Sequence, residues 1–166
     1  GATERAVYMA NVLGIDMGMF YKRRDYSKIV DGRNPIVAHE FLGTDIKGKD
    51  VLVVDDMIAS GDSMLDIAYD LKKRGANRVF AACTYALFTE GIDRFNKAVE
   101  EGVLGGVLST NLTYRRPELQ AAPWFFEADV SKYIAYFIAS MNHNISVSSL
   151  LDPHTKIKNL IAEHNK

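Results

Sequence analysis

Hydrophobic residues follow two different spacings along the chain, and these spacings predict a succession of strands and helices. Short apolar runs predict strands at Met17–Tyr21, Ile36–Leu42, Val51–Val54, Arg78–Thr84, Val103–Ser109 and Trp124–Ala128. Apolar residues three and four positions apart predict helices over Glu4–Leu13, Ser63–Arg74, Ile92–Glu101, Ser131–Met141 and Pro153–Lys166. Strands that alternate with helices predict an α/β fold: a doubly wound, mostly parallel sheet with helices on both faces.

The clearest strand is Val51–Val54, which is continuously apolar and rich in β-branched residues. Such a run is typical of a central parallel strand that is covered on both faces. We expect Asp55 and Asp56 to follow the end of this strand. Ligands of doubly wound sheets bind beyond the carboxyl ends of the strands, so these carboxylates are the first candidates for a site.

A polar segment, Lys22–Pro35, has no regular apolar spacing and predicts a long loop. Long loops inside compact domains are uncommon, and many of them are lids or binding loops. The segment begins with three cations, Lys22, Arg23 and Arg24. Taken alone, such a run is more typical of a solvated surface than of a site.

Composition narrows the class of protein. The chain has 166 residues, near the size of one domain, and a formal net charge of −1, which argues against a nucleic-acid partner. No apolar run approaches the ~18 residues of a membrane span, and no secretory pattern opens the chain. The single cysteine, Cys83, suits a reducing cytoplasm. The histidines lack metal-binding spacing, so no metal ligand is predicted.

The segment after Val54 combines two kinds of chemistry. Backbone N–H groups at a helix start, with the hydroxyls of Ser60 and Ser63, suit a phosphate dianion. The carboxylates of Asp55 and Asp56 can accept hydrogen bonds from sugar hydroxyls. Phosphate at one end and hydroxyls at the other describe a ribose 5-phosphate. The alternative is that Asp62 or Ser63 only caps the helix and Asp55 is a turn residue.

This segment resembles the ribose-phosphate-binding signature of type I phosphoribosyltransferases and of ribose-phosphate pyrophosphokinases. Further motifs are similar to the second family: Glu4-Arg5-Ala6, Lys22-Arg23-Arg24, Thr110-Asn111, Asp129-Val130-Ser131 and the closing Ser146–Leu151. The resemblance runs over residues 1–151, which we expect to form a phosphoribosyltransferase-like, ribose-phosphate-binding domain that lacks its first strand. Residues 152–166 are expected to be a terminal helical extension.

The resemblance implies transfer of pyrophosphate from Mg-ATP to ribose 5-phosphate, which gives phosphoribosyl pyrophosphate and AMP for nucleotide biosynthesis. Lys22 and Arg24 would be catalytic cations on a closing loop, and Asp55 and Asp56 would hold the ribose hydroxyls. The residues that would surround the 5-phosphate are Ala59, Ser60, Gly61, Asp62 and Ser63. ATP is the implied co-substrate. The Mg²⁺ ligands would lie mainly in an amino-terminal half absent from this chain, and the protein would be a homo-oligomer.

Four residues of the segment depart from the family pattern. Ala59 stands where an acidic residue is usual, Ser60 where Thr is usual, and Asp62-Ser63 where Gly-Thr is usual. Two alternatives stay open: a phosphoribosyltransferase, which would use the same sugar-phosphate loop, and a non-catalytic regulatory subunit, which Ala59 and Asp62 favour. The family also has a buried parallel strand between those that match Met17–Tyr21 and Val51–Val54. We expect the absent half or a second polypeptide to supply that strand, and the chain alone to be inactive.

Overall fold

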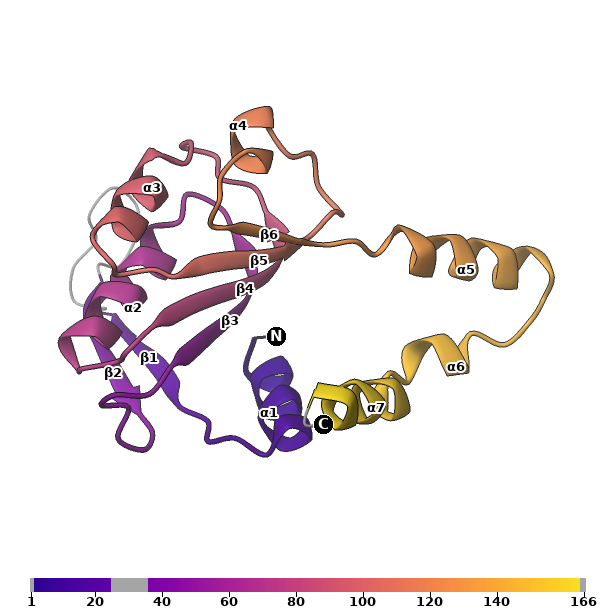
Figure 1. Ribbon diagram of the computed structural model, residues 1–166, viewed down its shortest axis with the longest axis horizontal. Coiled ribbons are helices and arrows are strands. Elements are labelled where there is room, and N and C mark those ends of the chain that lie inside the picture. Colours follow the sequence, from indigo (N-terminus) through magenta and orange to yellow (C-terminus); the bar gives the residue numbers. More distant parts are fainter. Residues whose placement is uncertain (1, 25–35, 165–166) are drawn as a thin grey trace.

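The computed structural model describes residues 2–24 and 36–164, and its centre is a four-stranded sheet (Figure 1). In spatial order the strands are β3 (Val51–Ile58), β4 (Val79–Ala86), β5 (Gly106–Thr110) and β6 (Phe125–Ala128). Each neighbouring pair is parallel. The predicted α/β class with a mostly parallel sheet is therefore confirmed.

Helices lie on both faces of this sheet, as predicted. The helices of the described residues are α1 (Ala2–Leu13), α2 (Asp62–Lys73), α3 (Asp93–Glu100), α4 (Pro117–Gln120), α5 (Ser131–Asn142), α6 (Ser148–Leu151) and α7 (His154–His164). The buried residues of α2 and α3 share one core with Val79, Ala81 and Val107. Helix α1 contacts β3, and its Tyr8 shares a pocket with Leu52 and Ala82 on the opposite face.

The core between the sheet and helices α2 and α3 contains an aromatic cluster of Phe88, Phe95 and Trp124. Phe95 is fully buried, and its ring stacks on Trp124 at 5.8 Å and meets Phe88 edge-on at 4.7 Å. Such pairs contribute ~0.5–1.5 kcal/mol beyond the burial of their area. The cluster fixes the beginning of α3 against the sheet, because Phe95 is the third residue of that helix.

Strands β1 (Met19–Arg24) and β2 (Ile36–Leu42) form a separate antiparallel hairpin. The bounds of β2 match the prediction. The predicted buried strand followed by a loop from Lys22 is wrong, because β1 continues through Arg24 and Tyr21 is 56% exposed. A strand of an antiparallel pair outside the main sheet can carry polar residues. The basic run at the end of β1 therefore lacks the apolar pattern by which a strand is predicted. Residues 25–35, the rest of the predicted loop, lie outside the described residues.

Strand β3 differs from its prediction in position and in length. It lies at the edge of the four-stranded sheet instead of the centre, and Leu52 is 42% exposed. It also continues to Ile58, so Asp55 and Asp56 lie within the strand rather than after it. The position differs because an apolar run does not distinguish an edge strand from a central one. The length differs because the pairing of β3 with β4 extends to Ile58, which lies opposite Ala86. The site therefore begins on a strand.

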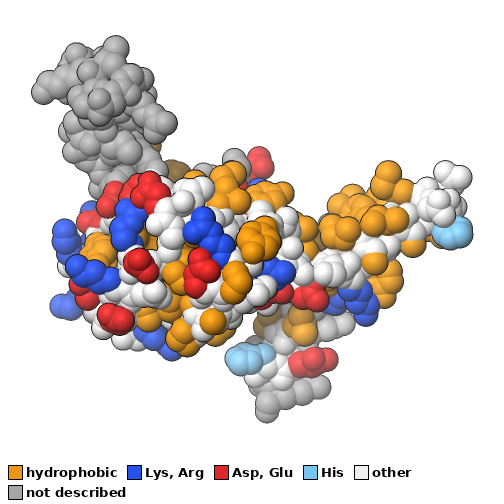
Figure 2. Space-filling model, turned by 90° about the horizontal axis from the view of Figure 1, so that it is seen from above, with side chains coloured by type: hydrophobic (Ala, Val, Ile, Leu, Met, Phe, Trp, Pro, Cys, Tyr) orange, Lys and Arg blue, Asp and Glu red, His pale blue; other side chains and the backbone are white. Residues whose placement is uncertain are grey.

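Helices α5, α6 and α7 form an arm that projects from the body and returns until α7 contacts α1 (Figure 1). No residue of α5 is buried, and Figure 2 shows hydrophobic side chains gathered on the projecting part of the arm. The exposed apolar residues of α5 are Tyr133, Ile134, Tyr136, Ile138 and Met141. The predicted terminal helix is α7. No helix of the described residues is both long and apolar enough to cross a membrane.

The aromatic cluster gives a first prediction. Phe95→Ala should lower the free energy of unfolding by about 3–5 kcal/mol, because it removes a fully buried ring and leaves a cavity. Urea unfolding measures the loss. Tyr114→Ala is the matched control, since Tyr114 is 82% exposed and its loss should change stability by less than about 0.5 kcal/mol. Equal losses in the two variants would contradict this account of the core.

Candidate phosphate and sugar site

The four parallel strands bring their carboxyl ends to one edge of the sheet, and polar side chains join the ends of β4, β5 and β6. The Thr110 hydroxyl donates to the carbonyl of Thr84 at 2.6 Å, which links β5 to β4. The Asn111 side chain donates to the Asp129 carboxylate at 2.6 Å, which links β5 to β6. The Ser131 hydroxyl is the largest cause that holds the pKa of Asp129 below its ordinary value. This edge is therefore a preformed polar surface.

Residues 59–63, here called the 59–63 loop, comprise the connection from β3 to α2 (residues 59–61) and the first two residues of α2. Thr89 N–H donates to the carbonyl of Ala59 at 2.9 Å. Gly61 is buried, caps α2, and has a left-handed φ of +92°. A Cβ at this position would lie 2.3 Å from Cε2 of Phe95. Only glycine fits both the backbone conformation and the contact, so the aromatic cluster determines the path of the loop.

Asp62 and Arg94 form an ion pair across the mouth of this loop. The Ser60 hydroxyl donates to the other carboxylate oxygen of Asp62 at 2.8 Å. Arg94 Nη2 donates to the carbonyl of Ser60 at 3.1 Å and to Glu90 at 2.8 Å. The Arg94 guanidinium lowers the pKa of Asp62, so this carboxyl is ionised at neutral pH. The suggested capping role of Asp62 or Ser63 is wrong, because α2 has no side-chain cap and its N-cap is Gly61.

Asp55 and Asp56 lie next to the loop on β3. Asp55 is half-buried and accepts a hydrogen bond from the N–H of Asp56 at 2.8 Å, while Asp56 is exposed. Across the sheet, burial raises the pKa of the Cys83 thiol, and the charges of the two carboxylates raise it further. Cys83 is thus a protonated core residue. Asp55 and Asp56 lie on β3 directly before the 59–63 loop, and their binding of ribose 5-phosphate stays a prediction.

The two predicted catalytic cations belong to a different element. The backbones of Lys22 and Arg24 lie in β1, opposite His39 and Ile36 of β2. Their side chains lie outside the described part of the structure. The assignment of these residues to a loop is corrected, whereas their catalytic role remains a prediction.

Among the described residues, no group of three or more His, Cys, Asp or Glu side chains could hold a metal ion. These residues therefore do not form a fitting site for Mg²⁺ by themselves.

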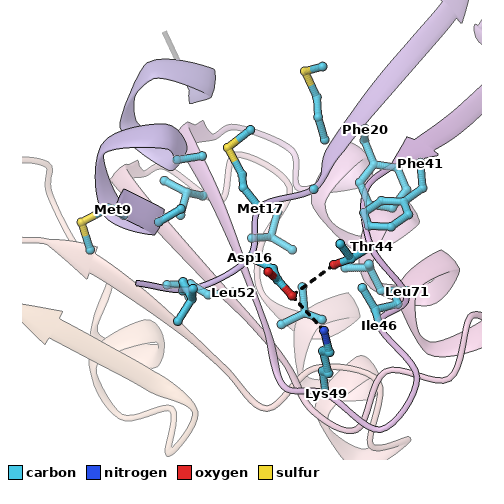
Figure 3. A pocket seen from close by; sticks show the side chains of 18 of the residues that line it. Met9, Asp16, Met17, Phe20, Phe41, Thr44, Ile46, Lys49, Leu52 and Leu71 are labelled. Atoms are coloured by element: carbon cyan, nitrogen blue, oxygen red, sulfur yellow. Dashed lines mark hydrogen bonds and ion pairs between the residues drawn. The ribbon is translucent and has the colours of Figure 1, made fainter. Parts of the chain in front are cut away.

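A cavity of about 770 Å³ lies between α1, the β1–β2 hairpin and the open edge of β3 (Figure 3). Its walls are mostly apolar and include Met9, Met17, Phe20, Phe41, Ile46 and Leu52. At one side, Asp16 pairs with Lys49 at 3.0 Å and accepts a hydrogen bond from Thr44 at 3.3 Å. The hydrogen bond from Lys49 is the largest cause that lowers the pKa of Asp16. Asp55 also lines the cavity, so this space adjoins the sugar side of the candidate site.

The fold and this site define a phosphoribosyltransferase-type domain. Residues 1–98 match the phosphoribosyl transferase domain family, and the chain belongs to this family. Curated relatives agree with the predicted resemblance to ribose-phosphate pyrophosphokinases. The protein of that name from Pyrococcus furiosus is 39% identical over 111 residues, which are 66% of this chain and 37% of the relative. Its namesake from Vibrio cholerae is 31% identical over 153 residues, which are 92% and 46% of the two chains.

A solved structure supports the same fold. The phosphoribosylpyrophosphate synthetase of Mycobacterium smegmatis superposes with a TM-score of 0.67 at 21% identity. The match covers 85% of this chain and 42% of the synthetase chain. The chain thus spans less than half the length of these relatives.

Arg94 is a neighbour of the candidate site that the sequence patterns do not predict. Its partner Asp62 lies 32 positions earlier, and no periodicity connects two such residues. One signal was available: Arg94 lies in the first turn of α3, where a cation is unfavourable beside the positive end of the helix dipole. A cation in that place indicates a specific anionic partner.

The geometry of Gly61 gives a second prediction. Gly61→Ala should destabilise the protein by more than Gly91→Ala, as measured by urea unfolding. Both glycines have left-handed φ values, +92° and +81°, so both variants incur ~1–2 kcal/mol of backbone strain. An added Cβ at Gly91 meets nothing within 4 Å, whereas at Gly61 it collides with Phe95. Equal losses would show that the loop moves away from the ring without cost.

Proposed function

We propose that this chain is the carboxy-terminal part of a ribose-phosphate pyrophosphokinase. The full-length enzyme would transfer pyrophosphate from Mg-ATP to the anomeric hydroxyl of ribose 5-phosphate and release AMP. The observation that carries the proposal is the buried Gly61, which turns the chain from the carboxylates of Asp55 and Asp56 directly into the start of α2. The names of the relatives at 31–39% identity support the same activity.

The site would bind the sugar from two ends. Backbone N–H groups of the 59–63 loop and of the first turn of α2 would receive the 5-phosphate, which the helix dipole also favours. Carboxylates cannot stabilise a phosphate dianion, so Asp55 and Asp56 would accept hydrogen bonds from the ribose hydroxyls. Anchoring both ends orients the anomeric hydroxyl toward its second substrate, and such positioning is a main source of rate enhancement.

The second substrate would approach from the side of the β1–β2 hairpin. Lys22 and Arg24 would stabilise negative charge on the transferring group, since such transfer depends mostly on positioning and on neutralisation of charge. Because the described residues hold no cluster suited to a metal, the Mg²⁺ ligands would come from the amino-terminal half and from ATP. The chain alone would then be inactive.

Two alternative functions use the same loop. A phosphoribosyltransferase would bind the same sugar phosphate but consume phosphoribosyl pyrophosphate. A non-catalytic regulatory subunit would bind ribose 5-phosphate without turnover, and Ala59 and Asp62 are the residues that favour it. The assay described next distinguishes both alternatives from the proposed function.

The test is release of AMP from ATP and ribose 5-phosphate by the full-length protein. We expect turnover in the wild type and a loss of kcat of about 10²–10³-fold in Lys22→Ala, the scale for removal of one transition-state donor. The KM for ribose 5-phosphate should change little, because Asp55, Asp56 and the 59–63 loop are intact.

Other results would select another function. Binding of ribose 5-phosphate without AMP release would favour the regulatory subunit. Cleavage of phosphoribosyl pyrophosphate with a nitrogenous base would favour the transferase. A raised KM with unchanged kcat in Lys22→Ala would mean that this residue binds the ground state instead.

We further propose that a β-strand from the amino-terminal half fills the cavity beside β3. The N–H of Val51 donates toward β4, to the carbonyl of Arg78 at 2.8 Å. Since hydrogen-bonding directions alternate along a strand, the N–H groups of Leu52 and Val54 face the cavity. A further parallel strand would satisfy these groups, and the apolar walls of the cavity would bury its side chains.

Hydrogen exchange tests this proposal. In the full-length protein the amides of Leu52 and Val54 should exchange at least about tenfold more slowly than in the isolated 166-residue chain, because a paired amide exchanges only after opening. Val53 is the control, since its N–H faces β4 in either case. Equal exchange of Leu52 and Val54 in the two proteins would exclude a strand in the cavity.

We also propose that the full-length protein is a homo-oligomer of the cytoplasm. The exposed apolar side chains of α5 support an interface on the arm, because large exposed apolar patches mark interaction sites. The single, buried Cys83 is consistent with a reducing compartment.

A further inference from the structure

The 59–63 loop poses an electrostatic problem for a phosphate ligand. Asp62 places a carboxylate within the loop, and its pKa is lowered, so it is charged at neutral pH. Asp55 and Asp56 stand a few residues earlier on β3. A dianion that approached α2 would meet the repulsion of Asp62 in the first turn of the helix, the place where the dipole otherwise favours it.

Arg94 is built to remove this repulsion. One of its terminal nitrogens pairs with Asp62, and the other donates to the carbonyl of Ser60 at 3.1 Å. The guanidinium of Arg94 therefore contacts the residues directly before and after Gly61. Glu90 accepts a further hydrogen bond from Arg94 at 2.8 Å, which restrains the guanidinium. The ring of the next residue, Phe95, packs against Gly61, so two consecutive residues of α3 contact the loop.

We propose that Arg94 is a positioning residue of the ribose 5-phosphate site, which neutralises Asp62 and turns its carboxylate away from the phosphate. This inference rests on the proposed function and concerns the same site. Arg94 acts through Asp62 and Ser60 and does not need to contact the ligand. The exposed fractions of the two side chains, 57% for Asp62 and 45% for Arg94, mean that the pair adds little to folding stability. Its effect should therefore be seen in ligand binding.

Isothermal titration of the full-length protein with ribose 5-phosphate, without ATP, tests the proposal. Arg94→Ala should raise the Kd at least about tenfold, because an uncompensated carboxylate then faces the phosphate. Asp62→Asn should bind at least as tightly as the wild type. The double variant Asp62→Asn/Arg94→Ala should recover to within about threefold of the wild type, since the repulsive charge is gone. The thermal midpoint should shift by less than about 4 °C in each variant.

Arg78→Ala is the matched control, because Arg78 forms an exposed ion pair with Asp50 at the opposite end of β3. Its Kd should equal that of the wild type. If Arg94→Ala binds as well as this control, Arg94 has no positioning role. If the double variant stays as weak as Arg94→Ala, the effect is structural and charge compensation is wrong. If the wild type does not bind ribose 5-phosphate at all, the proposed function fails, and the role of Arg94 fails with it.

Discussion

The contact between Gly61 and the ring of Phe95 is the constraint on which the candidate site depends. Gly61 approaches the ring so closely that no side chain fits between them, and its left-handed backbone turns the chain from β3 into α2. Phe95 cannot yield, because it is stacked on Trp124 and fully buried. The start of α2, and with it every N–H that could bind a phosphate, is therefore positioned by the core.

The proposed phosphate end and the proposed sugar end of the site have different surroundings. The proposed phosphate end lies beside α3, where Phe95 contacts Gly61 and Arg94 contacts Ser60 and Asp62. The sugar end lies on β3, which is paired on one side only and faces a cavity on the other. Asp55 lines that cavity. Whatever fills the cavity would thus contact the sugar end directly, so completion of the sheet and completion of the active site would be the same event.

Local patterns in the sequence predicted the elements well and their placement less well. The parallel sheet and the helices on both faces follow from periodicity, and the 59–63 loop follows from small residues after an apolar run. Periodicity does not report how many neighbours a strand has, so the apolar run predicts a central strand at Val51–Val54 although β3 lies at an edge. The polar run predicts a loop at Lys22 and Arg24, because a basic strand in a hairpin has no apolar spacing to reveal it.

Arg94 shows a different limit of prediction from sequence patterns, since its proposed role depends on a contact between residues far apart in the chain. The position of the 59–63 loop and its charge depend on different contacts. Its position depends on buried packing between Gly61 and Phe95, which tolerates almost no substitution. Its charge depends on an exposed ion pair between Asp62 and Arg94, which contributes little to stability. The charge of the loop therefore depends on residues that contribute little to the fold, which is why we expect Asp62 and Arg94 to act on ligand binding rather than on stability.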